Sequence, residues 1–272
     1  MNKDDFSYHL DQLLEVAIDT ARRASTILIE GFSKPHTLDY KNGRHNIVTE
    51  CDKLSERFIK TTLKKAFPDH GFFGEETGLD LVNNQKICWV VDPLDGTVNF
   101  AHQIPFFSIS IAATIGDQVL CGVVYSPMTN ELFYAKHLQG AFLNEKPLKT
   151  SAISQIEQGI FVTGFPYNLQ ENPGSCIEHF VAFAKKGVPI RRLGSAALDL
   201  AYVAAGRFDG FWEISLEPWD FSAAALLIKE AGGMISTYDG DPLHPQKTSS
   251  VLATNSYLHK SMQTLIQQST AK

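Results

Sequence analysis

The order of hydrophobic patterns along the 272-residue chain predicts an α+β half packed on an α/β half, with sheets layered between helices. In the first half, about residues 1–148, helical patterns come first and short apolar strands follow. In the second half, about residues 149–272, strand and helix patterns alternate. No low-complexity linker or internal repeat separates the halves, so we expect a single domain over residues 1–272.

Two amphipathic helices are predicted before the first strand. Apolar residues recur at helical spacing over residues 10–28, and a polar loop over residues 33–45 follows. Thr49 then precedes a second helix, which carries Asp52 in its first turn and is closed by Pro68. The spacing predicts a buried face formed by Leu54, Phe58, Ile59 and Leu63.

The strands of the first half are predicted as an antiparallel meander. A buried strand over residues 87–91 follows a loop that contains Gly74-Glu75-Glu76. Residues 107–115 and 119–125 flank a Gly-Asp-Gln turn, which indicates a hairpin. Two further short strands are expected at residues 131–135 and 140–144.

The second half alternates strands and helices. Strands are predicted at residues 160–163 and 210–213 and near Met234 and Val251. The expected helices cover residues 177–186, 196–205, 221–231 and about 258–267.

Composition limits the classes of partner. The net charge of −6 and the pI near 5.8 leave no bulk basic footprint, so no autonomous nucleic-acid binding is expected. Lys185-Lys186 and Arg191-Arg192 could form a local basic patch, but a solvated surface is the simpler interpretation. No apolar run approaches membrane-spanning length, and residues 1–30 lack the apolar centre of a secretory signal.

The cysteine spacing indicates a reducing compartment. The four cysteines are widely separated and form no Cys-x-x-Cys pair, so a disulfide framework and a zinc site are not expected. We therefore expect reduced thiols and a cytoplasmic location. The four residues are Cys51, Cys88, Cys121 and Cys176.

The most informative segment is residues 89–100, with the sequence WVVDPLDGTVNF. Asp92 stands at the end of a buried strand, where a carboxylate is unfavourable unless it is hydrogen-bonded, paired or bound to a metal. Asp95 follows across a rigid proline, so both carboxylates could converge on a hard cation. The amides of Gly96 and Thr97 could face a phosphate. A tight turn is the alternative interpretation of this Asp-Pro-x-Asp-Gly segment.

Two further acidic segments favour a cation site. Glu75-Glu76 is a paired-carboxylate loop, for which solvated charges are the alternative. Asp220 opens an alanine-rich helix, where it could serve only as an N-cap or first-turn acid. Together with Asp92 and Asp95, these acids have the oxygen chemistry that hard cations prefer.

Three ordered motifs resemble the inositol monophosphatase family. Residues 89–100 match W-x-x-D-P-x-D-G-T-x-N-F, and residues 74–76 match G-E-E. Residues 219–224 match W-D-x-A-A-G, with Ser222 for the first alanine and Ala224 for the glycine. Residues 191–220 look most like the bacterial SuhB-type branch. The resemblance covers nearly the whole chain and implies the layered α-β-α-β-α sandwich of the inositol monophosphatase and fructose-1,6-bisphosphatase type.

The resemblance implies a site for two or three Mg²⁺ ions. One ion would be held by Glu75, Asp92 and the carbonyl of Leu94, and a second by Asp92, Asp95 and Asp220. A weaker third ion would depend on Glu75 and water.

The resemblance also assigns the reacting groups. Gly96 and Thr97 would bind the phosphate, while Thr97 and Asp52 would accept the hydrogen bond and proton of the attacking water. Without the resemblance, Asp52 is better interpreted as a first-turn acid facing the helix dipole.

Substrate contacts and two loop residues follow from the same resemblance. Ser195, Ala196 and Glu213 would contact a polyol substrate, although Glu213 could instead be a surface acid. Asn46 stands where many relatives carry an aspartate, and Lys41 matches a loop lysine unless it is simply solvated.

The activity that the resemblance implies is that of an inositol-1-monophosphatase. The expected reaction is magnesium-dependent, lithium-sensitive hydrolysis of myo-inositol 1-phosphate and related polyol or sugar phosphates. Fructose 1,6-bisphosphate, 3′-phosphoadenosine 5′-phosphate and histidinol phosphate are alternative substrates. A regulatory role with a protein of the transcription and ribosomal RNA machinery is an alternative function. A homodimer is expected from relatives.

Overall fold

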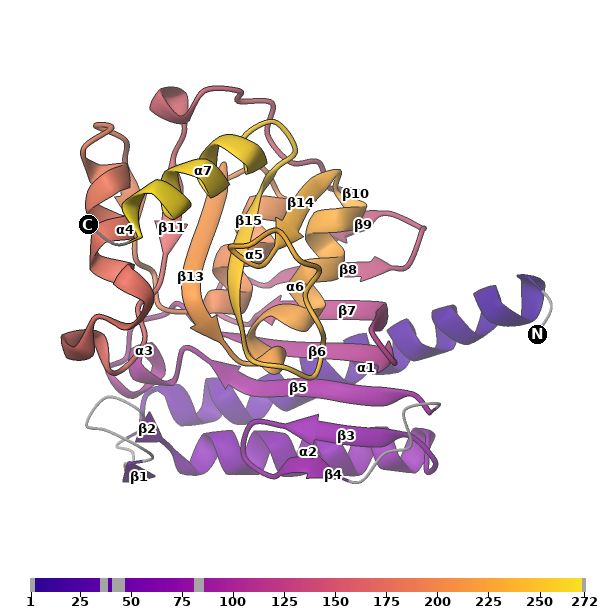
Figure 1. The fold of residues 1–272 in the computed structure, drawn as a ribbon. Coiled ribbons are helices and arrows are strands. Elements are labelled where there is room, and N and C mark those ends of the chain that lie inside the picture. Colours follow the sequence, from indigo (N-terminus) through magenta and orange to yellow (C-terminus); the bar gives the residue numbers. More distant parts are fainter. Residues whose placement is uncertain (1–2, 35–38, 41–46, 81–85, 271–272) are drawn as a thin grey trace.

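The computed structural model describes residues 3–34, 39–40, 47–80 and 86–270, and these form five alternating layers of helices and sheets (Figure 1). One outer helical layer packs on an eight-stranded sheet, a helix pair lies between that sheet and a five-stranded sheet, and a second helix pair covers the far side. The predicted α-β-α-β-α sandwich is therefore confirmed. From one side to the other the helices are α1 (Lys3–Phe32) and α2 (Glu50–Ala66), then α5 (Ala196–Ala204) and α6 (Pro218–Glu230), then α4 (Cys176–Ala184) and α7 (His259–Ser269).

The larger sheet comes from one continuous stretch of the first half. Its strand order is β10-β9-β8-β7-β6-β5-β3-β4, and every pair is antiparallel except β3 with β5. The predicted hairpin and meander are confirmed as β6 to β9. The strands are β3 (Gly71–Gly74), β4 (Gly78–Asp80), β5 (Cys88–Asp95), β6 (Ser108–Ile115), β7 (Gln118–Ser126), β8 (Glu131–Lys136), β9 (Ala141–Leu143) and β10 (Lys146–Pro147).

The smaller sheet is mixed and has the order β12-β11-β13-β15-β14. Strand β11 is parallel to both β12 and β13, whereas β15 is antiparallel to β13 and β14. The alternation predicted for the second half is confirmed, with the short β12 as an unpredicted addition. The strands are β11 (Phe161–Thr163), β12 (Ile190–Arg191), β13 (Gly210–Leu216), β14 (Gly233–Ser236) and β15 (Ser249–Asn255).

Short elements complete the described residues. Strands β1 (Asp39–Tyr40) and β2 (Ile47–Val48) pair antiparallel, so the segment predicted as a polar loop contains a strand. Helix α3 (Thr97–Ala101) begins directly after β5. Three single 3₁₀ turns are η1 (Ile156–Gln158), η2 (Leu169–Glu171) and η3 (Pro173–Ser175).

Strand β5 extends farther than predicted. It continues to Asp95 instead of ending near residue 91, and its register with β6 shifts by one residue between Asp92 and Asp95. Pro93 lies inside this bulge, where its missing amide donor is tolerated. The predicted turn is therefore a bulged strand end, and Asp92 and Asp95 are the register positions on either side of the bulge.

The buried face of α2 also differs from the prediction. Ile59 and Leu63 are fully buried, but Leu54 is 41% exposed. Polar residues take its place on the inward face, namely Asp52, Ser55 and Glu56. The prediction from apolar periodicity placed Leu54 on the buried face. It was wrong there because this part of the helix packs against backbone of the β5 bulge and of the turn after β3, which polar side chains bind.

None of the described helices combines the length and apolar character that crossing a bilayer requires. All four cysteines are buried and unpaired.

Candidate functional site

The end of β5 is the centre of a group of acidic side chains. Asp92 is 2% exposed, and its Oδ1 accepts a hydrogen bond of 3.0 Å from the Leu94 amide within the bulge. Burial raises the pKa of Asp92 well above its ordinary value, and the charges of Glu75, Asp95 and Asp220 raise it further. The structure therefore brings the four predicted acids within electrostatic range of one another.

Asp95 is held by the start of α5. Its carboxylate accepts hydrogen bonds from Ser195 Oγ at 2.5 Å, from the Ala197 amide at 2.8 Å and from the Ala196 amide at 3.1 Å. Ser108 Oγ adds a longer contact of 3.3 Å. Burial raises the pKa of Asp95, while these donors oppose that rise. Ser195 and Ala196 thus have a defined contact in Asp95, and their predicted contact with substrate stays a prediction.

Asp220 lies in the first turn of α6. Its Oδ2 accepts a 2.8 Å hydrogen bond from the Glu217 amide, so the first-turn interpretation from sequence describes one of its oxygens correctly. Burial raises the pKa of Asp220 well above its ordinary value, with further contributions from Asp95 and Glu75. The helix start is tied to the larger sheet because Ser110 Oγ donates to the Trp219 carbonyl at 2.9 Å.

Asp52 and Thr97 meet across the site. The Thr97 hydroxyl lies 2.9 Å from Asp52 Oδ1 and 3.0 Å from the Leu94 carbonyl oxygen. Asp52 Oδ2 accepts hydrogen bonds from the Thr49 amide at 2.9 Å and the Thr49 hydroxyl at 2.6 Å. Burial raises the pKa of Asp52 to about 6 despite these donors.

Gly96 turns the chain from β5 into α3. Its φ of 98° is in the left-handed region, and a Cβ here would lie 3.1 Å from the carbonyl oxygens of Gly194 and Phe106. Asn99 holds the same surroundings, because its Nδ2 donates to the carbonyls of Phe106 and Leu193 at 2.8 and 2.7 Å. The glycine and asparagine of the motif therefore fix the backbone next to Thr97.

Glu213 lies on β13 and is 8% exposed, so the surface-acid interpretation is wrong. Burial raises its pKa to about 8, Asp95 adds to that rise, and Arg192 opposes it. Its carboxylate packs against Gly164, where a Cβ would lie 2.0 Å from Oε2.

Sequence reasoning missed several acidic or phenolic groups near the site. Burial and the charges of Asp95 and Glu213 raise the pKa of Asp199 well above its ordinary value. Tyr167 is 57% exposed, and partial desolvation together with the charges of all four acids around β5 raises its pKa. Glu56 is 1% exposed on α2, and its pKa is raised by burial. For Glu56, the only signal in the sequence was its position four residues after Asp52, on the same face of the helix. A glutamate on an amphipathic helix is normally interpreted as solvent-exposed. Asn46 and Lys41 lie outside the described residues.

None of the ion pairs among the described residues involves Asp92, Asp95 or Asp220. As the side chains stand, no three Asp, Glu, His or Cys residues in the described part form a cluster that could hold a metal ion. The acids still affect one another through their charges, which raise the pKa values of Asp92 and Asp220. Buried carboxylates that repel one another suit a divalent cation, and their oxygen donors fit Mg²⁺.

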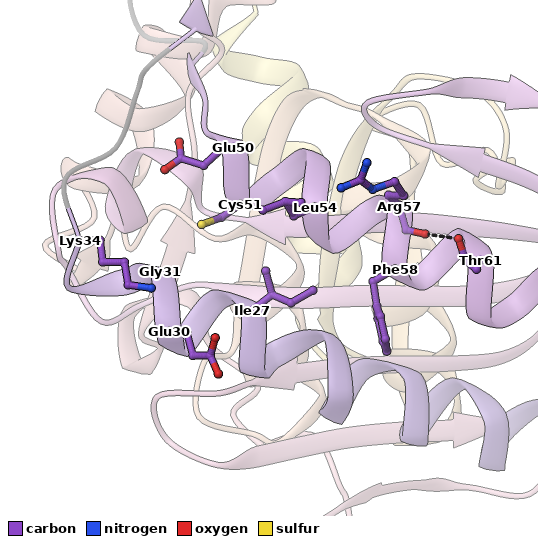
Figure 2. A pocket seen from close by; sticks show the side chains of 10 residues that line it. All are labelled: Ile27, Glu30, Gly31, Lys34, Glu50, Cys51, Leu54, Arg57, Phe58 and Thr61. Atoms are coloured by element: carbon purple, nitrogen blue, oxygen red, sulfur yellow. Dashed lines mark hydrogen bonds between the residues drawn. The ribbon is translucent and has the colours of Figure 1, made fainter.

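A groove lies on the side of the larger sheet that α1 and α2 cover. It has a volume of about 650 Å³ and lies between α1 and α2. Figure 2 shows Ile27 of α1 pointing toward α2 and Phe58 of α2 pointing toward α1, with the exposed Leu54 nearby. None of the predicted site residues lines it.

The five-layered fold and its acidic site define a class of protein. Residues 9–271 match the inositol monophosphatase family, and the chain belongs to this family of phosphatases. Among its relatives, Nus factor SuhB of Escherichia coli K12 is 40% identical over 251 residues, which cover 92% of this chain and 94% of that protein. An inositol-1-monophosphatase of Caulobacter vibrioides is 40% identical over 245 residues, which cover 89% and 96%.

Solved structures agree with this assignment. The extragenic suppressor protein suhB of Bartonella henselae has a TM-score of 0.88 and 34% identity, covering 94% of this chain and 98% of that chain. The inositol monophosphate-bound structure of SaIMPase-II has a TM-score of 0.79 and 31% identity, covering 93% and 92%. The family and fold that the motifs predicted are therefore confirmed.

Proposed function

We propose that the protein is a magnesium-dependent phosphomonoesterase that hydrolyses myo-inositol 1-phosphate and related polyol or sugar phosphates. The observation that carries the proposal is the group of mutually repelling acids at the end of β5, of which Asp92 and Asp95 are buried, beside the Gly96-Thr97 turn. Relatives named inositol-1-monophosphatase at 38 to 40% identity support the choice of substrate.

The metal-binding residues follow the family pattern. Glu75, Asp92 and the Leu94 carbonyl would hold one Mg²⁺ ion, and Asp92, Asp95 and Asp220 a second, with two or three ions in total. When bound, the ions supply positive charge that activates water and stabilises the departing oxygen. The acids of this chain provide oxygen donors whose mutual repulsion such charge would relieve.

Thr97 and Asp52 are proposed to accept the hydrogen bond and the proton of the attacking water. With a pKa of about 6, Asp52 is mostly ionised at neutral pH yet basic enough to accept a proton. The Thr97 hydroxyl, shared between Asp52 and the Leu94 carbonyl, can rotate to accept a hydrogen bond from water. The backbone amides of Gly96 and Thr97 would orient the phosphate.

Glu213 is the proposed contact for substrate hydroxyl groups, with Ser195 and Ala196 beside it. Its carboxylate is held against Gly164 and stands in range of the charges of Asp95 and Asp220. A buried hydrogen-bonding group can discriminate strongly against an analogue that lacks the matching hydroxyl.

A phosphate-release assay tests the function. Purified protein is incubated with myo-inositol 1-phosphate in Mg²⁺ or in EDTA, with and without Li⁺. We expect release only with Mg²⁺ and inhibition by Li⁺. A comparison of kcat/KM for fructose 1,6-bisphosphate, 3′-phosphoadenosine 5′-phosphate and histidinol phosphate then ranks the substrates. Absence of metal-dependent release from all four compounds would refute the proposal.

A regulatory role is the second candidate, because relatives named Nus factor SuhB are as similar as the named phosphatases. This role would involve a protein of the transcription and ribosomal RNA machinery. A catalytically inactive Asp92→Asn variant that rescues a deletion strain would support it, and failure of that variant alongside wild-type rescue would favour the enzyme.

Assembly and location complete the proposal. We expect a homodimer, which light scattering measures directly. The four buried, unpaired cysteines support a reducing compartment, and we propose the cytoplasm.

A further inference from the structure

Besides Asp52, two other residues on the inward face of α2, Ser55 and Glu56, contact segments that form the site. Ser55 Oγ donates a 3.0 Å hydrogen bond to the Pro93 carbonyl in the β5 bulge. Glu56 follows Asp52 by four residues and so lies on the same face of the helix. Its Oε2 accepts a 2.8 Å hydrogen bond from the Glu76 amide. Figure 1 shows α2 running beside β3 and β5, where these contacts are made.

Glu56 is a buried carboxylate whose polar contacts lie on the turn between β3 and β4. Its side chain is 1% exposed. Burial raises its pKa, and the backbone and side chain of Thr77, on the same turn, oppose that rise. Its Oε1 is buried and has no hydrogen-bond partner among the described residues. A carboxylate this deeply buried is stable only because such donors replace water.

The turn that Glu56 binds carries Glu75. The Glu75 amide donates to the Val91 carbonyl of β5 at 3.2 Å, whereas the next amide, that of Glu76, donates to Glu56. Gly74 lies so close that a Cβ there would be 2.4 Å from Glu56 Oε2. Glu75 therefore projects from a turn that is fixed on one side by β5 and on the other by α2.

We infer that Glu56 is a positioning residue for Glu75, on which it acts through the hydrogen bond from the Glu76 amide and its close contact with Gly74. The inference rests on the proposed function, in which Glu75 binds Mg²⁺. Without the hydrogen bond between Glu56 of α2 and the Glu76 amide, the turn can adopt conformations in which Glu75 is misplaced. Metal binding must then restore the order, which weakens affinity.

The test measures metal binding without substrate. Mg²⁺ is titrated into the metal-free full chain by calorimetry, and phosphate release is measured separately against Mg²⁺ concentration. Glu56→Ala removes the acceptor. Glu56→Gln keeps one oxygen for the turn and places its amide at the unpartnered Oε1 position. Thr77→Val removes the hydroxyl of an exposed residue on the same turn, whose side chain lowers the pKa of Glu56, and preserves a folded protein in case Glu56→Ala does not fold. Ile59→Val, a buried change on the same helix, controls for general destabilisation.

We expect Glu56→Ala to bind Mg²⁺ at least tenfold more weakly than the wild type, with most of kcat restored at saturating Mg²⁺. Thr77→Val should weaken binding about two- to fivefold, and Glu56→Gln and Ile59→Val should stay within about threefold of the wild type. A merely structural role would instead lower the melting temperature without separating the alanine and glutamine variants in metal affinity.

The outcomes distinguish this inference from the proposed function. Wild-type Mg²⁺ affinity in Glu56→Ala, or in Thr77→Val if the alanine variant does not fold, overturns the positioning role even if the enzyme is active. Equal losses in the alanine and glutamine variants also overturn it. Normal Mg²⁺ binding with the expected order of variants, but no phosphate release, refutes only the phosphatase. A wild-type chain that binds no Mg²⁺ overturns both.

Discussion

The hydroxyl of Thr97 lies 2.9 Å from Asp52 Oδ1, which joins the first turn of α2 to the residue that begins α3. The two residues of this contact are 45 positions apart in the sequence. Because the same hydroxyl reaches the Leu94 carbonyl at 3.0 Å, its single proton can serve either acceptor. Loss of the Asp52 contact therefore leaves Thr97 with an alternative partner.

The Asp52→Asn variant is expected to fold and to lose most activity. The asparagine oxygen can accept from Thr49, and its amide group can donate to Thr97, which then turns to Leu94. The variant cannot accept a proton, so kcat should fall about 10²- to 10⁴-fold, the usual contribution of a general base. Steady-state phosphate release measures this loss. A kcat within tenfold of the wild type would contradict the assignment of Asp52.

The same variant should change the pH dependence of stability. A folded-state pKa of about 6, against an ordinary value of 3.8, means that ionising Asp52 disfavours the folded state by about 3 kcal/mol. Wild-type stability should therefore fall as pH rises from about 4 to about 6. The asparagine variant should gain up to about 3 kcal/mol at neutral pH and nothing near pH 4. Urea unfolding in EDTA at both values measures the difference, and an equal gain at both would exclude Asp52 ionisation as its cause.

The Asp92→Asn variant tests whether repulsion among the acids is relieved by a cation. Removing this buried charge relieves its repulsion with Glu75, Asp95 and Asp220, so the metal-free variant should melt at a higher temperature than the metal-free wild type. Mg²⁺ should stabilise the wild type and have little effect on the variant, whose turnover should be largely lost. Thermal unfolding with EDTA and with Mg²⁺ provides the comparison. Equal stabilisation of both proteins by Mg²⁺ would place the ion elsewhere.

Glu213 should affect binding of the polyol more than the chemistry of the phosphate. If its carboxyl group forms hydrogen bonds with substrate hydroxyl groups, Glu213→Ala removes bonds that contribute about 1–2 kcal/mol, which raises KM for inositol 1-phosphate about five- to thirtyfold. An aryl phosphate without hydroxyl groups serves as the matched substrate, and its kcat/KM should change less than threefold. Equal losses on both substrates would show that Glu213 acts on the site as a whole.

The elements with clear periodicity were predictable, while those shaped by long-range contacts were not. Helices α1 and α7 and the β6–β7 hairpin follow directly from apolar spacing and turn residues. Strand β3 was missed because its four residues begin and end with glycine. The second glycine, Gly74, is explained by the close approach of Glu56 from another element and of the Phe72 ring from the same strand.

The site shows the same division. Asp92, Asp95 and Asp220 could be selected because acids in apolar surroundings need a partner. Their contacts could not be predicted, because Ser195 reaches Asp95 across 100 positions of sequence. Glu56 was missed for a related reason, since a glutamate on an amphipathic helix is normally solvated. Its burial depends on the turn after β3 packing against α2.

Gly96→Ala offers a final test of how the turn after β5 is built. An alanine here has an unfavourable positive φ and also places a Cβ 3.1 Å from two carbonyl oxygens. One of these, on Phe106, is held by Asn99 and so cannot easily move away. Gly116→Ala is the matched control, because Gly116 has a φ of 57° and no atom within 4 Å of the added Cβ.

The control should lose about 1 kcal/mol of unfolding free energy from backbone strain alone, and Gly96→Ala should lose about 2 kcal/mol or more. Gly96→Ala should also reduce kcat/KM at least tenfold because the neighbouring Thr97 moves, while the control keeps wild-type kinetics. Urea unfolding and phosphate release measure both effects, and equal behaviour of the two variants would show that packing around Gly96 does not shape the site.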